Sequence, residues 1–443
     1  MPQRWISMLR LLAAALLAVA LGGCTLVADY VIEPGQNSTT GQQPALLAAV
    51  PPTHLALHRS LFVADLHADT LLWDRDLLEA GDHGHIDLPR MQQGGLGLQV
   101  FTLVTDTPRE TPNADPAVDH CIYATSRNLA ALLTVLETRP PRAWFNLRAR
   151  AYDQAGKLLD AERRSRAPGY QGPELMVVRS AADLARLLAR RTAGENVVGG
   201  VLGVEGAHWV GQGDADEATT RAQVQELFDL GVRVFAPTHR FDNALGGASE
   251  GCSGRGLTSQ GRWALLEAER LGMVVDLAHA SSATLRDAVA LLAQPIIVSH
   301  TGVQEGCEGV CYRPRNLSDD EIRLVAAKGG LIGAGYWPEA VGPNGVQDIL
   351  RVMRQVARAL QQPAFKATHP GLDPHAHLAL GSDFDGAVET PIDVAGLPAL
   401  TWAMAQGGMT ETQLRQAAGG NACRLLAQRL PGGSAALAGT ACK

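Results

Sequence analysis

The 443-residue sequence lacks the motifs that mark the commonest nucleotide-binding proteins. It has no Gly-Lys-Ser/Thr phosphate loop, and the glycine clusters at 94–97 and 329–335 do not form a dinucleotide-binding fingerprint. The chain has no excess of positive charge, since its formal net charge is −7. The charge balance therefore favours neither nucleic-acid binding nor a polybasic membrane patch. What remains is an ordinary globular composition, with 46% hydrophobic and 19% charged residues.

The first residues are typical of an export signal. Arg4 and Arg10 precede the apolar run 11–23, which is short for a bilayer span but suits a secretory signal. The run leads into Leu21-Gly22-Gly23-Cys24, which resembles a bacterial lipobox with Cys24 as the lipidated residue. We therefore expect a lipoprotein signal peptide at 1–23 and a chain anchored by lipid in the bacterial cell envelope, facing the periplasm or exterior. An uncleaved anchor or an ordinary signal peptide is the alternative.

The composition divides the rest of the chain into three parts. Residues 24–55, rich in Gly, Gln, Ser, Thr and Pro, predict a flexible tether. Residues 56–430 predict one large domain, followed by a C-terminal tail at 431–443. Within the domain, residues 140–175 are charged and contain Gly and Pro, which predicts a surface insertion.

Cysteine is sparse, with seven residues including Cys24. Export would put the others in an oxidising compartment, where disulfides are allowed. Their positions favour two pairs, Cys307 with Cys311 and Cys423 with Cys442, although sequence does not determine connectivity. A metal site is the alternative for the first pair, and it is disfavoured because no second Cys/His cluster stands beside it.

Short apolar runs alternate with amphipathic helical segments from about residue 60 onward. Eight runs predict strands: 61–67, 95–103, 197–206, 232–239, 273–279, 295–300, 329–335 and 377–386. This alternation predicts an α/β fold of the TIM-type (β/α)8 barrel class. A doubly wound sheet would also accept it, but polar residues follow many of the strands, as a ring-shaped site at one barrel end requires.

Two histidines follow consecutive predicted strands. His279 ends one apolar run, His300 ends the next, and a helical pattern lies between them. Parallel strands joined by one helix place their carboxyl ends on the same face of a sheet. Two neutral imidazoles at such a place indicate a metal site. The alternative is that each histidine simply ends a strand and hydrogen-bonds a loop.

Further strand ends carry further ligand types. His67 and Asp69 are two residues apart in an extended segment and so share a face. Glu205 follows an apolar strand among glycines, where an unpaired carboxylate would cost several kcal/mol. Two more strands end in His239 and Asp383. His208, three residues after Glu205, is better explained as loop structure.

This inventory has imidazoles and carboxylates but no thiolate, a combination that suits Zn²⁺ or a similar divalent ion. It exceeds the needs of one tetrahedral ion with an open position. It is enough for two ions about 3.5–4 Å apart that share a carboxylate. Water between two such ions loses a proton near neutral pH and becomes the nucleophile, so a hydrolase of this kind needs no Ser–His–Asp triad.

Eight motifs occur in an order that is highly specific when taken together: DLHAD, HIDLPRMQQGGLGLQVFTL, GVEGAH, THRFDNALG, GLTSQGRWALLEAERLGMVVDLAHAS, PIIVSHTG, RNLSDDEI and LGSDFDG. From about residue 60 to 428 the chain resembles the membrane dipeptidase (renal dipeptidase) family of zinc metallopeptidases, related to the amidohydrolase barrels. The resemblance implies an amidohydrolase-like barrel with two Zn²⁺ per chain. It implies that His67, Asp69 and Glu205 hold one zinc, and that Glu205 bridges to a second held by His279 and His300.

The resemblance also implies three roles beside the metals. His239 would bind the substrate carbonyl or the developing oxyanion, and Arg315 would clamp the substrate carboxylate through its bidentate guanidinium. Asp383 would take a proton from the bridging water and deliver it to the leaving amine. Asp385 lies two residues further on, and the residue that directly ends the strand is the preferred choice. From the residues alone, Arg315 is equally well explained as a solvated loop cation.

We therefore expect hydrolysis of dipeptides with a free C-terminal carboxylate by a metal-bridging hydroxide, with a possible homodimer and no nucleic-acid partner. The alternative is another two-metal amidohydrolase acting on a cyclic amide, lactone or phosphoester, and Arg315 distinguishes the two because its clamp needs an anionic substrate. A non-catalytic lipoprotein is disfavoured because every expected ligand position is filled. The segments 140–175 and 302–313 are longer than in compact family members and would reshape the substrate pocket.

Overall fold

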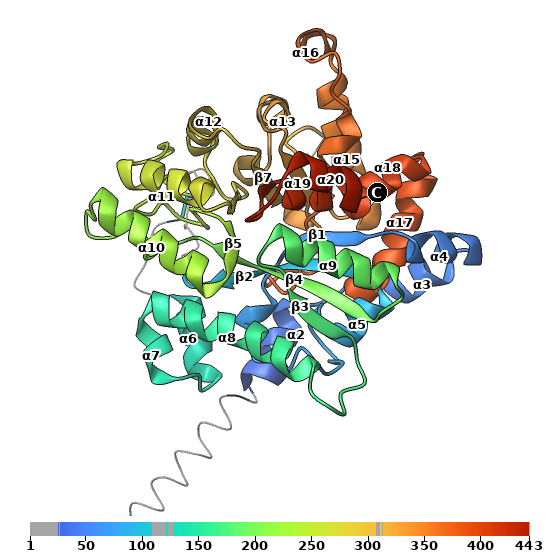
Figure 1. The fold of residues 1–443 in the computed structure, drawn as a ribbon, viewed down its shortest axis with the longest axis horizontal. Helices are drawn as coiled ribbons and strands as arrows, with labels where there is room; N and C mark the ends of the chain where they lie inside the picture. Colours follow the sequence, from blue (N-terminus) through green and yellow to red (C-terminus); the bar gives the residue numbers. More distant parts are fainter. Residues whose placement is uncertain are drawn as a thin grey trace, which may run out of the picture.

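The computed structural model describes residues 25, 27–108, 121–122, 128–306, 311 and 313–442 (Figure 1). Nine strands are present in this part of the chain: β1 Val63–Ala68, β2 Leu96–Val104, β3 Glu174–Val177, β4 Val197–Glu205, β5 Val232–Phe235, β6 Val274–Val275, β7 Ile297–Thr301, β8 Leu331–Ala334 and β9 Leu378–Leu380. All eight strands expected from the sequence are among them. The ninth, β3, was not expected.

The strands form a closed barrel. They pair in parallel in the order β6-β5-β4-β2-β1-β9-β8-β7. A parallel bridge between Asp276 and Ile297 then joins the two ends of this order, with the Leu277 amide donating to the Ile297 carbonyl at 2.8 Å. Because all strands run the same way, their carboxyl ends lie at one end of the barrel, and the predicted (β/α)8 barrel is confirmed.

Helices pack around the barrel in Figure 1. The helical segments are η1 Ala28–Ile32, α2 Glu33–Gln36, α3 Gln43–Ala48, α4 Pro52–Arg59, η2 Thr70–Leu72, α5 Leu88–Gln93, α6 Leu129–Leu136, α7 Pro141–Phe145, α8 Leu147–Ser165, α9 Ala181–Thr192, α10 Glu217–Leu230, α11 Ser259–Arg270, α12 Ser282–Leu291, η3 Arg313–Arg315, α13 Asp319–Ala327, α14 Pro338–Val341, α15 Val346–Gln361, α16 Pro363–Thr368, η4 Pro374–His377, η5 Val394–Gly396, α17 Leu397–Gln406, α18 Glu411–Arg415, η6 Gln416–Gly420, α19 Asn421–Arg429 and α20 Ala435–Ala441.

Side-chain caps start several of the helices that connect barrel strands. Ser281 caps α12, between the two histidine-bearing strand ends, by accepting a hydrogen bond from the Thr284 amide. Ser318 and Glu321 form a reciprocal capping box at α13. These caps satisfy amides that the first helical turn leaves unpaired, which explains why polar residues stand where each apolar helix begins.

The prediction of a surface insertion at 140–175 is wrong. Helix α8 buries Ala151, Ala155 and Leu158 in the main hydrophobic core, and these residues recur at helical spacing. Strand β3 then pairs with the first half of β4, residues 174–177 against 197–200, while β5 pairs with its second half. Other charged residues of this helix lie on its outer side, but Arg150 and Glu162 are buried with it, so the helix packs as part of the barrel.

The prediction of a flexible tether at 24–55 is wrong over its described part. Residues 28–59 are largely helical, and Glu33 is fully buried with its carboxylate 2.5 Å from Arg75 Nε. The segment continues along the loop that follows β9, where the Thr40 amide donates to the Thr390 carbonyl at 3.0 Å. A polar composition predicts flexibility only where the segment has no surface to pack against. Here the barrel domain provides an ion-pair partner, Arg75, and a backbone hydrogen-bond partner, the Thr390 carbonyl.

The predicted Cys423–Cys442 disulfide is confirmed, and it holds α20 against α19, so the C-terminal tail is ordered through Cys442. A second disulfide, between Cys121 and Cys252, joins loops 131 residues apart and was not predicted. Cys24, Cys307 and the predicted signal peptide at 1–23 lie outside the described residues. Within the described part of the chain, no helix is both long and apolar enough to cross a membrane.

Candidate metal centre

Glu205, at the end of β4, lies at the centre of a buried polar cluster. Its Oε1 atom is 3.3 Å from His67 Nε2, 2.9 Å from His279 Nε2 and 3.4 Å from His300 Nε2. The other carboxylate oxygen, Oε2, is 3.4 Å from His239 Nε2. The barrel therefore brings four imidazoles from β1, β7 and the ends of β5 and β6 to one carboxylate, although up to 233 residues separate them in the chain.

Two aspartates complete the cluster on the side of β1. His67 Nε2 lies 3.4 Å from Asp69 Oδ1 and 3.8 Å from Asp383 Oδ1. The whole cluster contains three overlapping sets of potential ligands, each with its ligand atoms within 4.8 Å of one another: His67, Glu205 and His300; Glu205, His239 and His279; and His67, Asp69 and Asp383. All the candidate ligands named from the sequence thus meet at one place.

The protonation of these groups fits a cation. Neither oxygen of Glu205 accepts a hydrogen bond from a described residue, although imidazole nitrogens lie close by. Burial raises the pKa of Glu205 to about 7. Burial also lowers the pKa of His279 and of His300 well below the ordinary value, so both rings are neutral and offer lone pairs. A buried carboxylate without a donor, facing the neutral imidazoles of His279 and His300, is a donor set that suits Zn²⁺ or a similar ion.

Outer partners orient the candidate ligands. Ser299 Oγ lies between two rings, 3.3 Å from His67 Nδ1 and 2.9 Å from His300 Nδ1. Glu250 Oε2 lies 3.5 Å from His279 Nδ1. Such contacts to the far nitrogen of a ligating histidine fix its tautomer and orientation. Sequence reasoning missed Glu250, because it lies in an irregular loop and follows no strand.

The loop that carries Glu250 is held from several sides. Its Oε1 accepts a hydrogen bond from Arg240 Nε at 3.2 Å, and its backbone carbonyl accepts one from the Ile122 amide at 2.7 Å. The Cys121–Cys252 disulfide binds the same two segments covalently. The unexpected disulfide therefore lies two residues from a side chain that faces the metal centre.

Arg315 is buried beside the cluster. Its Nη2 donates to the His300 carbonyl at 2.8 Å and lies 3.4 Å from His279 Nε2, and its Nη1 donates to the Ala278 carbonyl. Among the described residues, no carboxylate forms an ion pair with this guanidinium, and burial lowers its pKa. A buried cation with an unpaired charge is a place where an anionic group of a ligand would be stabilised.

Asp383 and Asp385 have different surroundings. Asp383 faces the cluster, and burial raises its pKa well above the ordinary value. Asp385 points away: its carboxylate accepts hydrogen bonds from Thr70 Oγ1 and Arg75 Nη2, both at 2.7 Å. Both aspartates have positive φ angles, 61° and 62°, which non-glycine residues rarely adopt. The ion pair of Asp385 with Arg75 therefore holds a strained loop that presents Asp383.

Known proteins resemble this chain both in sequence and in fold. Residues 53–430 match the family described as Membrane dipeptidase (Peptidase family M19). The chain belongs to the membrane dipeptidase family. Two curated relatives are uncharacterized dipeptidases of Schizosaccharomyces pombe, 28% identical over 239 residues and 31% identical over 198 residues. These matches cover 52% and 43% of this chain and 53% and 42% of the relatives, so the chain spans about half the length of the relatives it matches.

Solved structures of membrane dipeptidases share the fold. The crystal structure of dipeptidase AC, a metallopeptidase of family M19, has a TM-score of 0.61 and 25% identity, covering 84% of this chain and 99% of that one. A Rhodobacter sphaeroides metallopeptidase, solved with a phosphinate mimic of the dipeptide L-Ala-D-Ala, has a TM-score of 0.60 at 24% identity with the same coverage. This second likeness shows the fold alone.

A serine nucleophile is not supported in this membrane dipeptidase family member. Residues 247–251 read Gly-Ala-Ser-Glu-Gly, the pattern of a nucleophile elbow. The pattern lies within the long loop that joins β5 to α11 rather than at a sharp turn directly from a strand into a helix, and the Ser249 hydroxyl has no hydrogen-bond partner among the described residues. Without a base to accept its proton, Ser249 is not an activated nucleophile.

His208 lies near the cluster without joining it. Its ring stacks on Phe241 with centroids 4.5 Å apart, and it belongs to none of the potential ligand sets found among the described residues. Burial lowers the pKa of His208 to about 3, so the ring is neutral. The arrangement agrees with the expectation that His208 is loop structure.

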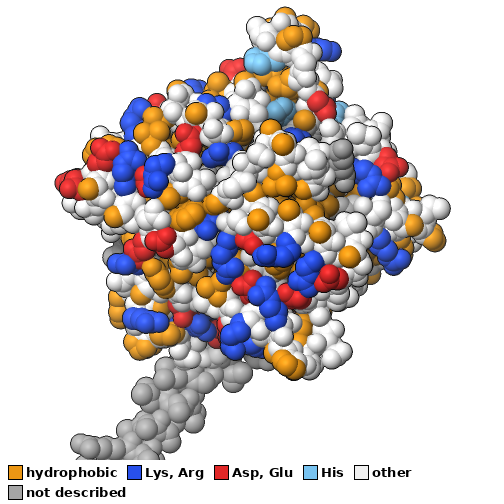
Figure 2. Space-filling view, viewed as in Figure 1, with side chains coloured by type: hydrophobic (Ala, Val, Ile, Leu, Met, Phe, Trp, Pro, Cys, Tyr) orange, Lys and Arg blue, Asp and Glu red, His pale blue; other side chains and the backbone are white. Residues whose placement is uncertain are grey.

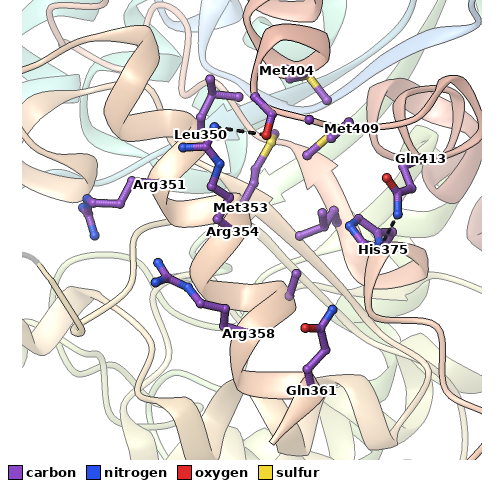
Figure 3. Close-up of a pocket in the computed structure, with 14 residues that line it drawn as sticks. Leu350, Arg351, Met353, Arg354, Arg358, Gln361, His375, Met404, Met409 and Gln413 are labelled. Carbon is purple, nitrogen blue, oxygen red and sulfur yellow. Dashed lines mark hydrogen bonds between the residues drawn. The ribbon is translucent and has the colours of Figure 1, made fainter.

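A cavity of about 480 Å³ lies elsewhere, between α15, α17 and α18. Figure 3 shows the side chains of Met353, Met404 and Met409 on its wall. Leu378, which also lines it, begins β9, so the cavity lies toward the amino end of that strand. Since barrel enzymes keep their chemistry at the carboxyl ends of the strands, this cavity is not the candidate active site.

Proposed function

We propose that this chain is a zinc-dependent dipeptidase that hydrolyses dipeptides with a free C-terminal carboxylate. The observation that carries the proposal is the position of Glu205, whose carboxylate is within 3.4 Å of four imidazoles and accepts no hydrogen bond from them. Membership of a metallopeptidase family supports the same chemistry. When bound, two zinc ions would acidify a water molecule and polarise the substrate carbonyl.

In this proposal the ligands divide between two ions. His67, Asp69 and Glu205 would hold one zinc, and Glu205 would bridge to the second. The second ion would be held by His279 and His300, whose Nε2 atoms are 3.1 Å apart. The division is supported by Glu205 Oε1, which lies within 3.4 Å of an imidazole nitrogen from each proposed ligand set.

Arg315 would select the substrate. A dipeptide has one carboxylate, and a planar guanidinium binds a carboxylate through two parallel hydrogen bonds. The buried guanidinium of Arg315 lies next to His279, so a bound carboxylate would hold the scissile bond of a dipeptide close to the cluster. In a longer peptide the same fit would bring only the C-terminal peptide bond to the cluster.

His239 would stabilise the negative charge that develops on the substrate oxygen, and Asp383 would transfer the proton of the attacking water. His239 Nδ1 lies 3.3 Å from the Asp106 carbonyl, which can only accept. A neutral imidazole carries one proton. Nε2 can donate to a developing oxyanion only when it holds that proton, and Nδ1 then cannot donate to the Asp106 carbonyl. Asp383, whose pKa burial raises, would accept a proton from the attacking water and pass it to the leaving amine.

The test uses paired substrates that differ in one group. Purified chain with added Zn²⁺ is assayed against a dipeptide panel and the same dipeptides with an amidated C-terminus. We expect a loss of about 100-fold in kcat/KM on amidation, and a similar loss for Arg315→Met on the free dipeptides only, because both remove a charge-assisted pair. A chelator and His279→Ala should abolish both activities.

The alternative is another two-metal amidohydrolase, acting on a cyclic amide, lactone or phosphoester. It would be favoured if amidated dipeptides or neutral lactones were cleaved as fast as free dipeptides. Cleavage of the dipeptide panel in excess chelator would contradict the metal-dependent mechanism itself.

We also propose that Cys24 is lipidated and that the protein is held in the bacterial cell envelope, facing the periplasm or exterior. The support is the sequence of residues 1–24 alone. Metabolic labelling with a fatty-acid analogue should mark the wild-type chain and not Cys24→Ser. A homodimer stays a prediction from the family resemblance, tested by sedimentation of the purified chain.

A further inference from the structure

The exposed large hydrophobic side chains of the described structure are concentrated in one region. There are six of them, with exposed fractions from 40% to 88%, and they are Val27, Val31, Leu129, Leu132, Phe145 and Tyr152. They occur only in η1, α6, α7 and α8 or directly before them. Single exposed hydrophobic residues are ordinary on protein surfaces, but a concentration of this kind marks an interaction site.

The helices that carry these side chains adjoin one another. Ala28 and Ile32 of η1 pack in one cluster with Leu133 and Leu136 of α6, and Thr25 Oγ1 donates to the Leu136 carbonyl at 3.4 Å. Only four residues separate the end of α6 from the start of α7. We call Val27, Val31, Leu129, Leu132 and Phe145 the anchor-side surface. Tyr152 is left out because its hydroxyl donates to Glu226 of α10 at 2.6 Å.

The position of this surface in the chain indicates what covers it. Residues 11–23 form an uncharged apolar run that ends beside Cys24, and the body of the protein begins at Thr25, already hydrogen-bonded to α6. One residue spans at most about 3.6 Å, so no spacer separates Cys24 from the anchor-side surface. Figure 2 shows hydrophobic and basic side chains together at the lower left of the molecule, where Figure 1 places α6 and α7.

The chemistry of α7 fits the surface of a membrane. Residues 139–148 contain three arginines, Trp144 and Phe145 and no acidic residue. Arg139 and Arg148 pair with carboxylates of neighbouring helices, whereas Arg142 is exposed and forms no ion pair with a described residue. Exposed aromatic and aliphatic side chains beside unpaired cations are typical of segments that lie at a lipid interface.

We propose that the anchor-side surface rests on the lipid bilayer, with Phe145 and Leu132 at the boundary of headgroups and acyl chains and Arg142 among anionic headgroups. The membrane would then hold the protein at two points, the N-terminal anchor and this surface. Burial of these apolar side chains and attraction of Arg142 to anionic lipid would add to the binding that the anchor supplies. The proposal concerns attachment and is independent of the reaction that the metal centre performs.

The test uses a matched pair of full-length variants, Phe145→Trp and Phe365→Trp. Phe365 lies on α16, at the top of Figure 1 and far from α6 and α7 at its lower left. Each variant is reconstituted in phosphatidylethanolamine–phosphatidylglycerol vesicles, with and without brominated acyl chains, after flotation shows that the chain is bound. We expect bromine to quench about half or more of the emission that Phe145→Trp adds to the parent, and none of that from Phe365→Trp, because bromine quenches only at acyl depth.

Equal, weak quenching of both variants on chains that float would overturn the proposal while leaving the anchor intact. Failure of the chain to float would overturn both. A second copy of the chain is the other candidate occupant. If Leu132→Gln with Phe145→Gln turned a dimer into a monomer in sedimentation, the surface would be a subunit interface and the proposal would be wrong.

Discussion

Replacing Glu250 is expected to weaken zinc binding without touching a metal ligand. Its carboxylate lies 3.5 Å from His279 Nδ1, a buried nitrogen that makes no hydrogen bond with a described residue. When Nε2 of a histidine binds a metal, the other nitrogen keeps its proton, and a carboxylate there fixes the tautomer and makes the ring a stronger ligand. Glu250 is the carboxylate placed to do this for His279.

The size of the effect follows from what each substitution leaves behind. Loss of such an outer partner typically lowers metal affinity about 10–100-fold, or roughly 1.4–2.8 kcal/mol. Glu250→Gln keeps the shape and an acceptor oxygen but loses the charge, so we expect a loss near tenfold. Glu250→Ala also leaves Arg240 without the carboxylate it donates to at 3.2 Å, so we expect a loss near 100-fold.

The assay is competition for Zn²⁺ between the purified chain and a chromophoric chelator at neutral pH, which needs no substrate. Glu267→Gln is the matched control, because Glu267 is also buried and paired with arginines, Arg221 at 3.0 Å and Arg270 at 2.5 Å, but belongs to α11. It should lower stability and leave zinc affinity unchanged. If both Glu250 variants bound zinc within about threefold of the control, the argument for an outer-shell role would be refuted.

Three further predictions concern charge, protons and the C-terminus. Asp385→Asn should lower the free energy of unfolding by about 1.5–3 kcal/mol, since it removes one charged partner of the buried Arg75, which keeps its ion pair with Glu33. Burial alone would raise the pKa of Asp385, but the Arg75 charge holds it below the ordinary value. Its stabilisation is therefore present above about pH 4 and lost as pH falls through the lower folded pKa, so thermal unfolding of the variant should depend less on pH there. Zinc affinity should fall as pH drops below about 7, because zinc must displace protons from Glu205, whose pKa burial raises to about 7, and from His67, whose pKa is raised by the Glu205 and Asp69 carboxylates against the effect of burial; chelator competition that gave the same zinc affinity at every pH would contradict a ligand role for both groups. Replacing Cys423 and Cys442 by serine should cost about 3 kcal/mol in chemical denaturation, because the bridge closes a loop of 19 residues, and an unchanged midpoint would contradict this.

Signals local to the chain were enough to predict the barrel and the members of the cluster. Each strand was a short apolar run followed by a helical pattern, and parallel strands joined by helices must bring their carboxyl ends to one rim. His67, Glu205 and His300 stood at such ends, so their meeting followed from topology without any knowledge of distances. Their metal-binding roles stay predictions until zinc is measured.

The predictions were wrong for two segments whose polar composition hides how they pack against the barrel. Helix α8 looked like a surface insertion because its charged residues dominate the composition, whereas its small apolar side decides where it packs. Residues 24–55 were predicted to be a tether because Gln, Thr and Pro are common there, but Glu33 forms an ion pair with Arg75 of the barrel domain. In both cases the partner surface, which composition does not describe, supplies the stabilising free energy.

By itself, the sequence determined the order of strands and helices and the residues that end each strand, because apolar periodicity and caps act over a few neighbouring positions. Only the tertiary structure decided that Glu250 faces His279, that Cys121 bonds Cys252 and that Asp385 turns away from Asp383. These contacts depend on how loops from distant parts of the chain fold over the barrel rim. Loop conformation is set by long-range packing, so no local pattern in the chain predicts it.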